Sequence, residues 1–409
     1  MRAVVSATGV NTFFGKTAML VEKAEKHSHF QDAVLRIGNF LILNTLWLVA
    51  LIVIVALFRG DPMVDTILFA LVLTVAAIPV ALPAVLSVTM AVGASTLAAM
   101  RAIVSRLVSL EEMAGMDVLC SDKTGTLTKN QLVLGEPVVM GGRTRDAPAL
   151  KQADVGIAVS GATDAARAAA DLVLTEPGLS VITRAVEEAR RIFERMNAYA
   201  IYRIAETIRV LLFMTLSIVA YNFYPVTAVM IVLIAILNDF PIMMIAYDNQ
   251  PVAPRPVRWD MHRVLMVSSA LGLMGVIESF LLLWIAKAFM ALPAPIVQTV
   301  IFLKLLVAGH LTIYITRNVG KIWDRPWPNW KFFTACETTQ AIGTLAAVYG
   351  WFVTPIGWEY ALGMWGYALV WFLVESAVKI STYRMLRSGT RLHERHLARI
   401  GASFNSHAP

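Results

Sequence analysis

Charged residues are scarce in this sequence, and cysteine is nearly absent. Only 15% of the residues are Asp, Glu, Lys or Arg, whereas about 25% is usual in a soluble domain. The two cysteines, Cys120 and Cys336, stand far apart and form no paired motif, which excludes a disulfide framework and a cysteine-based zinc site. The shortage of charge, together with 57% hydrophobic residues, excludes an ordinary soluble protein and favours one that lies in a lipid bilayer.

Long apolar runs make up most of the chain. A membrane-spanning helix needs about 20 mostly apolar residues, and we expect about eight such spans, the second of them broken by prolines. Their approximate limits are 38–58, 64–96, 200–221, 226–247, 264–288, 296–316, 332–352 and 359–381. The predicted fold class is therefore an α-helical polytopic membrane protein.

Basic residues are distributed unevenly between the predicted loops. The loops on one side hold a single basic residue, Arg59, whereas the opposite loops and the tail 382–409 hold many. The positive-inside rule then places both termini in the cytoplasm. The same distribution explains the formal net charge of +7. We therefore expect the lipid bilayer to be a partner and expect no binding of nucleic acid.

One polar insert, about 97–199, separates the first two predicted spans from the other six. Short apolar runs typical of buried strands occur at 116–120, 154–159 and 171–175. Residues 162–170 are typical of a helix, and the alternation of strands with a helix predicts a small α/β domain. From about 179 to 221 the sequence contains neither Gly nor Pro, which predicts one continuous helix that leads from this domain into the membrane.

The segment Cys120-Ser-Asp-Lys-Thr-Gly-Thr-Leu-Thr128 begins at the end of the first predicted strand. A carboxylate such as that of Asp122 can accept a phosphoryl group as a transient acyl-phosphate. Lys123 can neutralise phosphate charge, and Thr124 can donate a hydrogen bond to a phosphate oxygen. Such a transfer needs Mg²⁺ to offset the charge of the transferring group. We predict Asp122, Lys123 and Thr124 as catalytic residues; the alternative is an ordinary polar turn after a strand.

This segment resembles the phosphorylation signature of P-type ATPases, in which the aspartate attacks the terminal phosphate of ATP. Further segments are similar to the plasma-membrane proton-pump subfamily: Ile78-Pro-Val-Ala-Leu-Pro83, Ser109-Leu-Glu-Glu-Met-Ala-Gly-Met-Asp117, Thr207-Ile-Arg209, Ile236-Leu-Asn-Asp239 and Ala153-Asp-Val-Gly-Ile-Ala-Val159. The resemblance implies ATP-driven export of H⁺ across the plasma membrane through an aspartyl-phosphate, and a HAD-like phosphorylation domain. It also implies that Asp122, Thr124 and Asp146 hold the Mg²⁺.

Asp239 lies within an apolar run that extends from Ile231 to Ile245. An ionisable group at that depth is costly and is a functional candidate by default. The resemblance implies that Asp239 accepts the proton and that Arg209, in the preceding span, is its partner. We expect Asn238 to orient Asp239. A static Asp–Arg pair that joins two helices stays open as the alternative.

Two prolines, Pro79 and Pro83, cannot both fit a regular helix. They free backbone carbonyls in the middle of the membrane, which is how broken helices build ion sites in transporters; a simple kink is the alternative. The predicted ion pathway thus consists of Asp239, Arg209, Asn238, Pro79 and Pro83. For the other charges within spans, we expect Glu375 and Lys379 to pair with each other. We expect the remaining ones to lie near interfaces or to join helices: Glu278, Lys287, Lys304 and His310.

Compared with the family pattern, parts of a pump are expected to be missing. The family places a nucleotide-binding domain between the positions of Asp122 and Asp146, which are close in this sequence. In the hinge, Gly142 stands where the family has its magnesium-binding Asp, and only Asp146 matches. We therefore expect a deletion near 140–145, no nucleotide-binding residues, no dephosphorylation loop, and spans that match three to ten of the family's ten.

The expected organisation has five parts. They are the end of an actuator domain with its linker (1–36), spans three and four (37–98), a stalk with a remnant phosphorylation domain (99–178), a stalk helix with spans five to ten (179–381) and a basic cytoplasmic tail (382–409). By resemblance the chain is an H⁺-exporting ATPase, although we expect it to be unable to hydrolyse ATP alone. Two alternatives stay open: a non-enzymatic remnant or passive proton conduit, and one part of a split pump whose actuator and nucleotide-binding parts form a separate chain.

Overall fold

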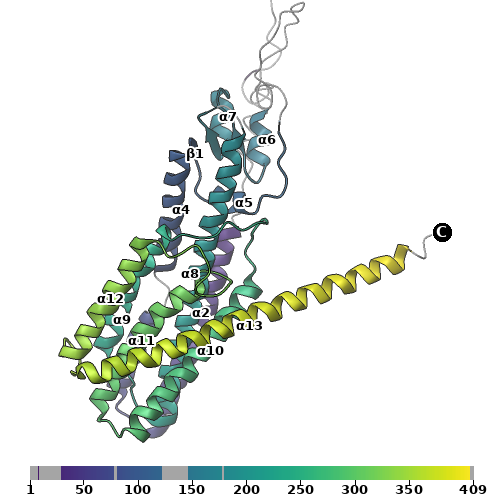
Figure 1. Cartoon of the computed structure of the whole chain (residues 1–409). Helices are drawn as coiled ribbons and strands as arrows, with labels where there is room; N and C mark the ends of the chain where they lie inside the picture. The colour runs from purple at the N-terminus through teal and green to yellow at the C-terminus, as the bar shows by residue number, and fades with distance from the viewer. Residues whose placement is uncertain (1–7, 9–28, 78–80, 122–145, 177–178, 406–409) are drawn as a thin grey trace, which may run out of the picture. The chain divides into compact units, whose positions relative to one another are not determined.

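The computed structural model describes residue 8 and residues 29–77, 81–121, 146–176 and 179–405. Helices dominate, and one small sheet accompanies them (Figure 1), which confirms the predicted fold class. The chain divides into two compact units. Unit 1 comprises Met1–Asp32, Leu86–Glu194 and Pro251–Trp259. Unit 2 comprises Ala33–Val85, Arg195–Gln250 and Asp260–Pro409.

Long helices form unit 2, and three of them, α2, α4 and α8, begin or end in unit 1. The helices are α2 (His29–Arg59), α3 (Met63–Ala77), α4 (Ala81–Ala99), α8 (Ser180–Tyr221), α9 (Ala228–Met243), α10 (Met261–Trp284), α11 (Ala294–Thr316), α12 (Trp330–Tyr349) and α13 (Gly357–Asn405). Short helical turns extend two of them, the 3₁₀ turn η3 (Met244–Tyr247) and the π turn η4 (Ile285–Phe289). Helix α11 lies in the centre, because it packs against α9, α10, α12 and α13 and buries most of its side chains.

Seven of the described helices are long and apolar enough to cross a membrane. The predicted span 332–352 is not among them, although it does form helix α12, of 20 residues. The reason is its composition, since Glu337, Gln340 and several threonines lower its mean hydropathy. Some of these polar groups face protein: Thr339 and Gln340 are buried, and the Tyr314 hydroxyl donates to Glu337 Oε1 at 3.0 Å. Helix α13 differs too, because it continues past the predicted span to Asn405.

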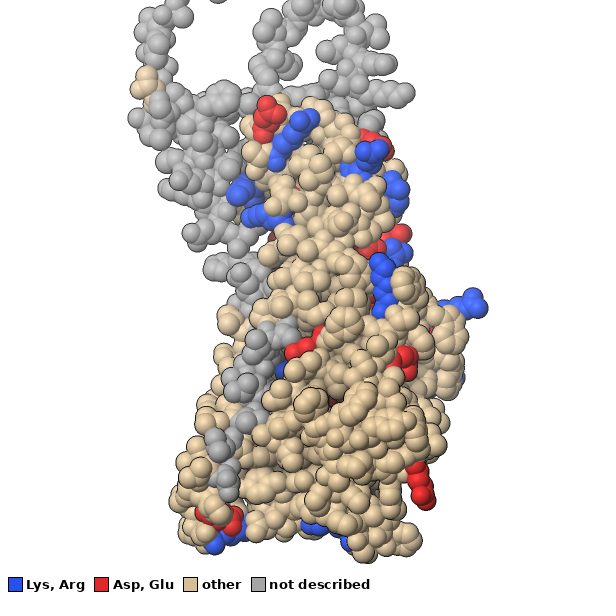
Figure 2. All heavy atoms as spheres, turned by 90° about the vertical axis from the view of Figure 1, so that its left-hand side faces the viewer, with Lys and Arg blue, Asp and Glu red and all other residues tan. Residues whose placement is uncertain are grey.

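Large apolar side chains cover the outer surface of the long helices. Figure 2 shows a wide area of this surface on which charged side chains are few. Exposed examples on α9 and α13 are Val229, Val232, Ile236, Phe240, Leu362, Leu369, Val370 and Leu373. Lipid tails solvate such side chains, whereas backbone groups must be satisfied within the helices themselves. The surface therefore fits a multi-pass membrane protein.

A three-stranded sheet forms the centre of unit 1. Its strands are β1 (Ala102–Val104), β2 (Ile157–Ala158) and β3 (Leu172–Leu174), in the order β1-β3-β2. β1 pairs with β3 in antiparallel fashion, while β2 and β3 run parallel and are connected through α7 (Asp164–Ala169). Asp171, just before β3, is buried; it accepts from Arg106 Nε at 2.6 Å and from the Gly156 backbone N–H at 2.9 Å.

One predicted strand of unit 1 is wrong. Residues 116–120 form no strand, and Val118 and Leu119 are exposed. A strand needs a neighbouring strand for its backbone hydrogen bonds. The central strand β3 already pairs with β1 on one edge and with β2 on the other, so it offers residues 116–120 no free edge. The sequence analysis also missed β1. The sequence also predicts that the segment 130–150 is loosely ordered, because strands that lose their neighbours expose their edges. Residues 130–145 lie outside the described residues. Residues 146–150 belong to α6 (Asp146–Gln152).

A buried carboxyl group makes the stability of unit 1 depend on pH. Glu111, on α5 (Ser109–Ala114), is only 6% exposed. Burial, aided by the neighbouring Glu112, raises the pKa of Glu111 from 4.5 to about 8. Between these values the folded chain keeps a proton that the unfolded chain has lost. The stability contributed by this group is therefore complete below pH 4.5 and is lost as the pH rises towards 8.

We expect Glu111→Gln to abolish this pH dependence, since an amide does not titrate. In the unchanged chain, the free energy of opening of α5 should fall by up to about 1.4 kcal/mol per pH unit within that window. Hydrogen exchange of the α5 amides, corrected for intrinsic rates, measures it. Glu112→Gln is the matched control and should keep the slope while moving it to lower pH. An unaltered slope in Glu111→Gln would assign the pH dependence to another group.

Candidate functional site

The predicted phosphorylation site is mostly beyond what the structure describes. Asp122, Lys123 and Thr124 lie outside the described residues. Asp146 is the first residue of α6, but its side chain is not described either. Within the part of the chain that is described, no three His, Cys, Asp or Glu side chains are grouped so that they could hold a metal ion. The Mg²⁺ ligands therefore remain a prediction from the sequence.

The two predicted pathway prolines lie within or beside a gap in the described residues. Helix α3 ends at Ala77 and α4 begins at Ala81, and Pro79 lies between them, outside the described residues. Pro83 is exposed in the first turn of α4, where a missing N–H costs no helical hydrogen bond. Pro83 therefore fits the first turn of α4 as the structure describes it.

The predicted proton acceptor lies on the outer side of its helix. Asp239 on α9 is exposed, while its neighbour Asn238 is 4% exposed. The charged group that acts on Asp239 is Arg203 on α8, and Tyr199 lies within electrostatic reach of both. The amide oxygen of Asn238 is buried without a hydrogen-bond partner. Asn238 and Asp239 therefore face different surroundings, one inside the bundle and one at its surface.

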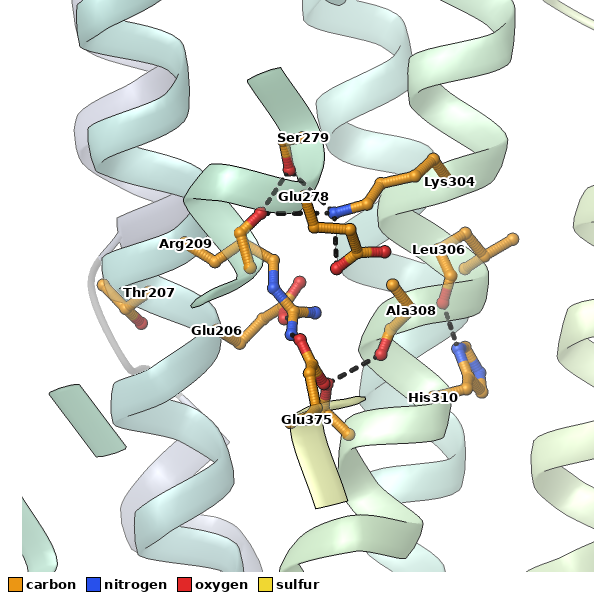
Figure 3. Close-up of polar contacts among 12 residues, drawn as sticks. Glu206, Thr207, Arg209, Glu278, Ser279, Lys304, Leu306, Ala308, His310 and Glu375 are labelled. Carbon is orange, nitrogen blue, oxygen red and sulfur yellow. Dashed lines mark hydrogen bonds and ion pairs between the residues drawn. The ribbon is translucent and has the colours of Figure 1, made fainter. Parts of the chain in front are cut away.

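Arg209 has other partners than the one we expected. Its side chain is fully buried on α8, and it binds two carboxylates (Figure 3). Nη1 donates to Glu206 Oε2 at 3.0 Å, and Nη2 donates to Glu375 Oε1 at 2.7 Å. Thr312 on α11 completes the arrangement, since it accepts from Arg209 at 2.8 Å and donates to Glu375 Oε2 at 3.2 Å. The expected pairing of Arg209 with Asp239 is not what the structure shows.

A second buried ion pair lies beside the first. Lys304 Nζ on α11 is 3.2 Å from Glu278 Oε2 on α10, and it also donates to the Ser279 hydroxyl at 2.7 Å. Both charged side chains are at most 1% exposed. The expectation that Glu278 and Lys304 join helices is confirmed. Figure 3 shows both pairs converging between the helices, so four helices, α8, α10, α11 and α13, contribute to one buried charge cluster: Glu206, Arg209, Glu278, Lys304 and Glu375.

The expected pair of Glu375 with Lys379 is wrong. Lys379 Nζ instead donates to the carbonyls of Ile315, in the last turn of α11, and Asn318, just after it, both at 2.9 Å. A lysine is stabilised there by the unsatisfied carbonyls of a helix end. Spacing along one helix predicted a local pair, but partners from other helices proved closer. The other two charges are accounted for as well: Lys287 lies over the Phe223 ring, and His310 binds the Leu306 carbonyl and Thr339.

A glycine on α10 makes room for the cluster. A methyl group on Gly275 would lie 2.0 Å from Arg209 Nε, which no real contact allows. A methyl group on Gly272, one turn earlier, would lie 2.8 Å from Ile208 Cβ, which is also too close. Small residues of this kind let membrane helices approach closely. The sequence analysis did not use these glycines, although small residues three positions apart in an apolar helix are the signal that could have found them.

Comparisons of the sequence with known proteins show which family the chain resembles. The chain is 35% identical, over 614 aligned residues, to the "Putative cation-transporting ATPase MJ1226" of Methanocaldococcus jannaschii, covering 95% of this chain and 76% of the relative. The chain belongs to the family of P-type cation-transporting ATPases. It is also 24% identical to a plasma membrane ATPase of Kluyveromyces lactis, over 85% of this chain, and 40% identical to Plasma membrane ATPase 2 of Saccharomyces cerevisiae, over 52% of this chain. No protein-family model matches it.

Membership of this family makes the chain a multi-pass membrane protein related to cation transporters. The chain spans 65% of the Kluyveromyces lactis relative and 22% of the Saccharomyces cerevisiae relative. The alignment with the archaeal ATPase extends over 614 residues, although this chain has only 409. The relative therefore contains a long stretch that has no counterpart here.

We expect Arg209→Met to destabilise unit 2 by about 3–5 kcal/mol, because Glu206 and Glu375 lose their shared cation in a buried site. Thermal unfolding of the purified chain in lipid measures this. The matched control is Arg325→Met, at an exposed position, which should change stability by no more than about 0.5 kcal/mol. Equal stability of the two variants would show that the buried pairs do not hold the helices together.

Proposed function

We propose that this chain belongs to a proton-exporting P-type pump of the plasma membrane and forms its ion pathway together with the base of its phosphorylation domain. The observation that carries the proposal is Asp239. It is an acid on an apolar helix of the membrane unit, next to a buried amide and within reach of the cation Arg203. A carboxyl group that moves between apolar surroundings and a nearby cation changes its proton affinity, which is what a proton carrier requires.

The relatives support the proposed location in the plasma membrane. Fungal plasma membrane ATPases are among the proteins that the chain resembles. The excess of basic residues on one side favours cytoplasmic termini. In this proposal Asp239 and Asn238 carry and orient the proton, Pro79 and Pro83 open α3 and α4 for it, and Arg209 fixes the helices around the path instead of pairing with Asp239.

The chemistry at the phosphorylation motif is the second part of the proposal. Asp122 would accept the phosphoryl group, with Lys123 and Thr124 binding its oxygens. Carboxylate and hydroxyl oxygens are ligands that Mg²⁺ prefers, so Asp122, Thr124 and Asp146 are suited to hold it. When bound, Mg²⁺ would offset the negative charge of the phosphate. ATP enters only if a nucleotide-binding domain is supplied from elsewhere.

The long stretch of the archaeal relative without a counterpart here supports an internal deletion in this chain. Phosphoryl transfer depends on positioning and charge stabilisation, which the domains expected to be missing would supply. We therefore propose that the chain does not hydrolyse ATP alone. A separate chain with the actuator and nucleotide-binding parts would make it one half of a split pump. Without such a partner it would be a passive proton conduit.

Phosphoenzyme formation separates these two cases. Membranes that contain the chain are incubated with Mg²⁺ and labelled ATP or acetyl phosphate, beside the variant Asp122→Asn. If the shortened domain still presents a live nucleophile, hydroxylamine-sensitive label appears and is lost in Asp122→Asn. We expect label from acetyl phosphate and none from ATP, since the sequence predicts no nucleotide-binding residues in this chain. The absence of label from both donors would contradict a catalytic role for Asp122.

Proton flux tests the pathway independently of ATP. In vesicles with an imposed pH gradient, we expect Asp239→Asn to reduce the proton flux through the chain at least about tenfold. The reason is that the substitution replaces a carboxyl group, which can bind and release a proton, by an amide, which cannot. Asp61→Asn, in the short loop between α2 and α3, is the control and should conduct like the unchanged chain. Flux that survives in Asp239→Asn would remove this residue from the pathway.

A further inference from the structure

The buried charge cluster carries one surplus negative charge when all its members are ionised. Three of its members are carboxyl groups and two are cations: Glu206, Glu278, Glu375, Arg209 and Lys304. All five side chains are at most 4% exposed. A charge that is buried without compensation is costly, and a buried carboxyl group avoids the cost by keeping its proton. One added proton would make the cluster neutral.

The two ion pairs of the cluster form one electrostatic unit, and Gly275 on α10 touches both of them. Lys304 Nζ donates to the Gly275 carbonyl oxygen at 3.4 Å, and a methyl group on this glycine would lie 2.0 Å from Arg209 Nε. Arg209 is within electrostatic reach of all three acids, and Glu375 is within reach of both Glu278 and Lys304. Groups that interact in this way bind and release protons as a set and not one by one.

The hydrogen bonds of the cluster leave two carboxylate oxygens without a partner. Glu375 accepts through both of its oxygens. Glu206 uses Oε2 towards Arg209 at 3.0 Å, and Glu278 uses Oε2 in the ion pair with Lys304 at 3.2 Å. The Oε1 atoms of Glu206 and Glu278 are buried, and neither has a hydrogen-bond partner among the described residues. Unsatisfied buried acceptors are costly, so the geometry offers more than one place for a proton and does not select between them.

Other titratable groups lie around the cluster, on four helices. They are Tyr202 and Arg203 on α8, Asp239 on α9, His310 on α11 and Tyr367 on α13. The tyrosines are neutral at pH 7, and Arg203 acts on Asp239. His310 uses both ring nitrogens, towards the Leu306 carbonyl and Thr339. In the part of the chain that the structure describes, the ion pairs of the three cluster acids therefore involve Arg209 and Lys304 alone.

We propose that the buried charge cluster is a second proton-binding site, distinct from Asp239, which holds one exchangeable proton shared by its three carboxyl groups at neutral pH. The count of charges, and not the surroundings of one residue, sets the number of bound protons. The ligand is a proton and not a metal cation, because Arg209 already lies between the carboxylates of Glu206 and Glu375. The proposal concerns proton binding and holds whether or not the chain pumps.

Infrared spectroscopy of the full chain in lipid vesicles detects the proton through the carbonyl stretch of a protonated carboxyl group. Each variant is compared with the unchanged chain at pH 7, so that bands of Glu111 and Asp239 cancel in the difference spectrum. We expect Glu206→Gln, Glu278→Gln and Glu375→Gln each to lose the band of one carboxyl group, because each substitution removes the surplus charge. A band that disappears in only one of these variants would assign the proton to that residue alone, and a band that survives in all three would show an ionised cluster. Either result overturns the proposal.

Changes of the cations give the opposite sign and a matched control. Lys304→Met raises the surplus to two negative charges, so the band of a second carboxyl group should appear. The double variant Lys304→Met/Glu278→Gln removes one acid and one cation together and should keep the single band of the unchanged chain. Glu337→Gln, in the same unit but outside the cluster, should also keep it. A double variant without the band would contradict the dependence on charge count.

Thermal unfolding in the same vesicles shows that the variants fold and tests the proposal a second time. All samples carry Glu111→Gln, so that the pH dependence of unit 1 is absent. Without a further substitution, the melting temperature should fall as the pH rises above about 4.3, because the folded cluster keeps a proton that an unfolded chain releases there. The three Gln variants should lack this fall, and the double variant should retain it. An equal fall in the Gln variants would show that the cluster holds no proton.

Discussion

The guanidinium group of Arg209 lies in the centre of the membrane unit without access to solvent, and the helices around it are arranged to satisfy it. It needs carboxylates from its own helix and from α13, a hydroxyl group from α11 and a glycine on α10 that leaves room for its side chain. Because a buried cation without partners is strongly unfavourable, these four helices can pack together in few other ways. The position of Lys304 against Glu278 and of Lys379 at the end of α11 follows the same constraint.

This constraint bears on transport as much as on stability. A family that moves cations must hold polar groups within an apolar bundle, and such groups are tolerated only where other polar groups meet them. In this chain they form two neighbouring regions on either side of α9. Asp239 is exposed on α9 and Arg203 acts on it electrostatically, whereas Asn238 is buried and, like Glu206, lies near Gly309 of α11.

The sheet of unit 1 is small and consists of three short strands. β3 lies between two short strands, and its buried neighbour Asp171 is held by Arg106 and by the Gly156 backbone. The residues that lead into the phosphorylation motif, 116–121, have no strand partner and are mostly exposed. In a domain of this kind the carboxyl end of a strand positions the catalytic group, so the lack of pairing here agrees with the proposal that other parts must complete the site.

The sequence by itself determined the class of the protein, because membrane spans and a phosphorylation motif depend on local composition and spacing. The length of an apolar run predicts a helix across lipid, and the relatives confirmed the P-type family. The partners of the buried charges could not be read in this way. Glu375 and Lys379 look like a pair along one helix, and Arg209 looks like the partner of Asp239. Only the tertiary structure decided otherwise, since electrostatic energy depends on distance in space, and the nearest carboxylate to Arg209 beyond its own helix is 166 residues away in sequence.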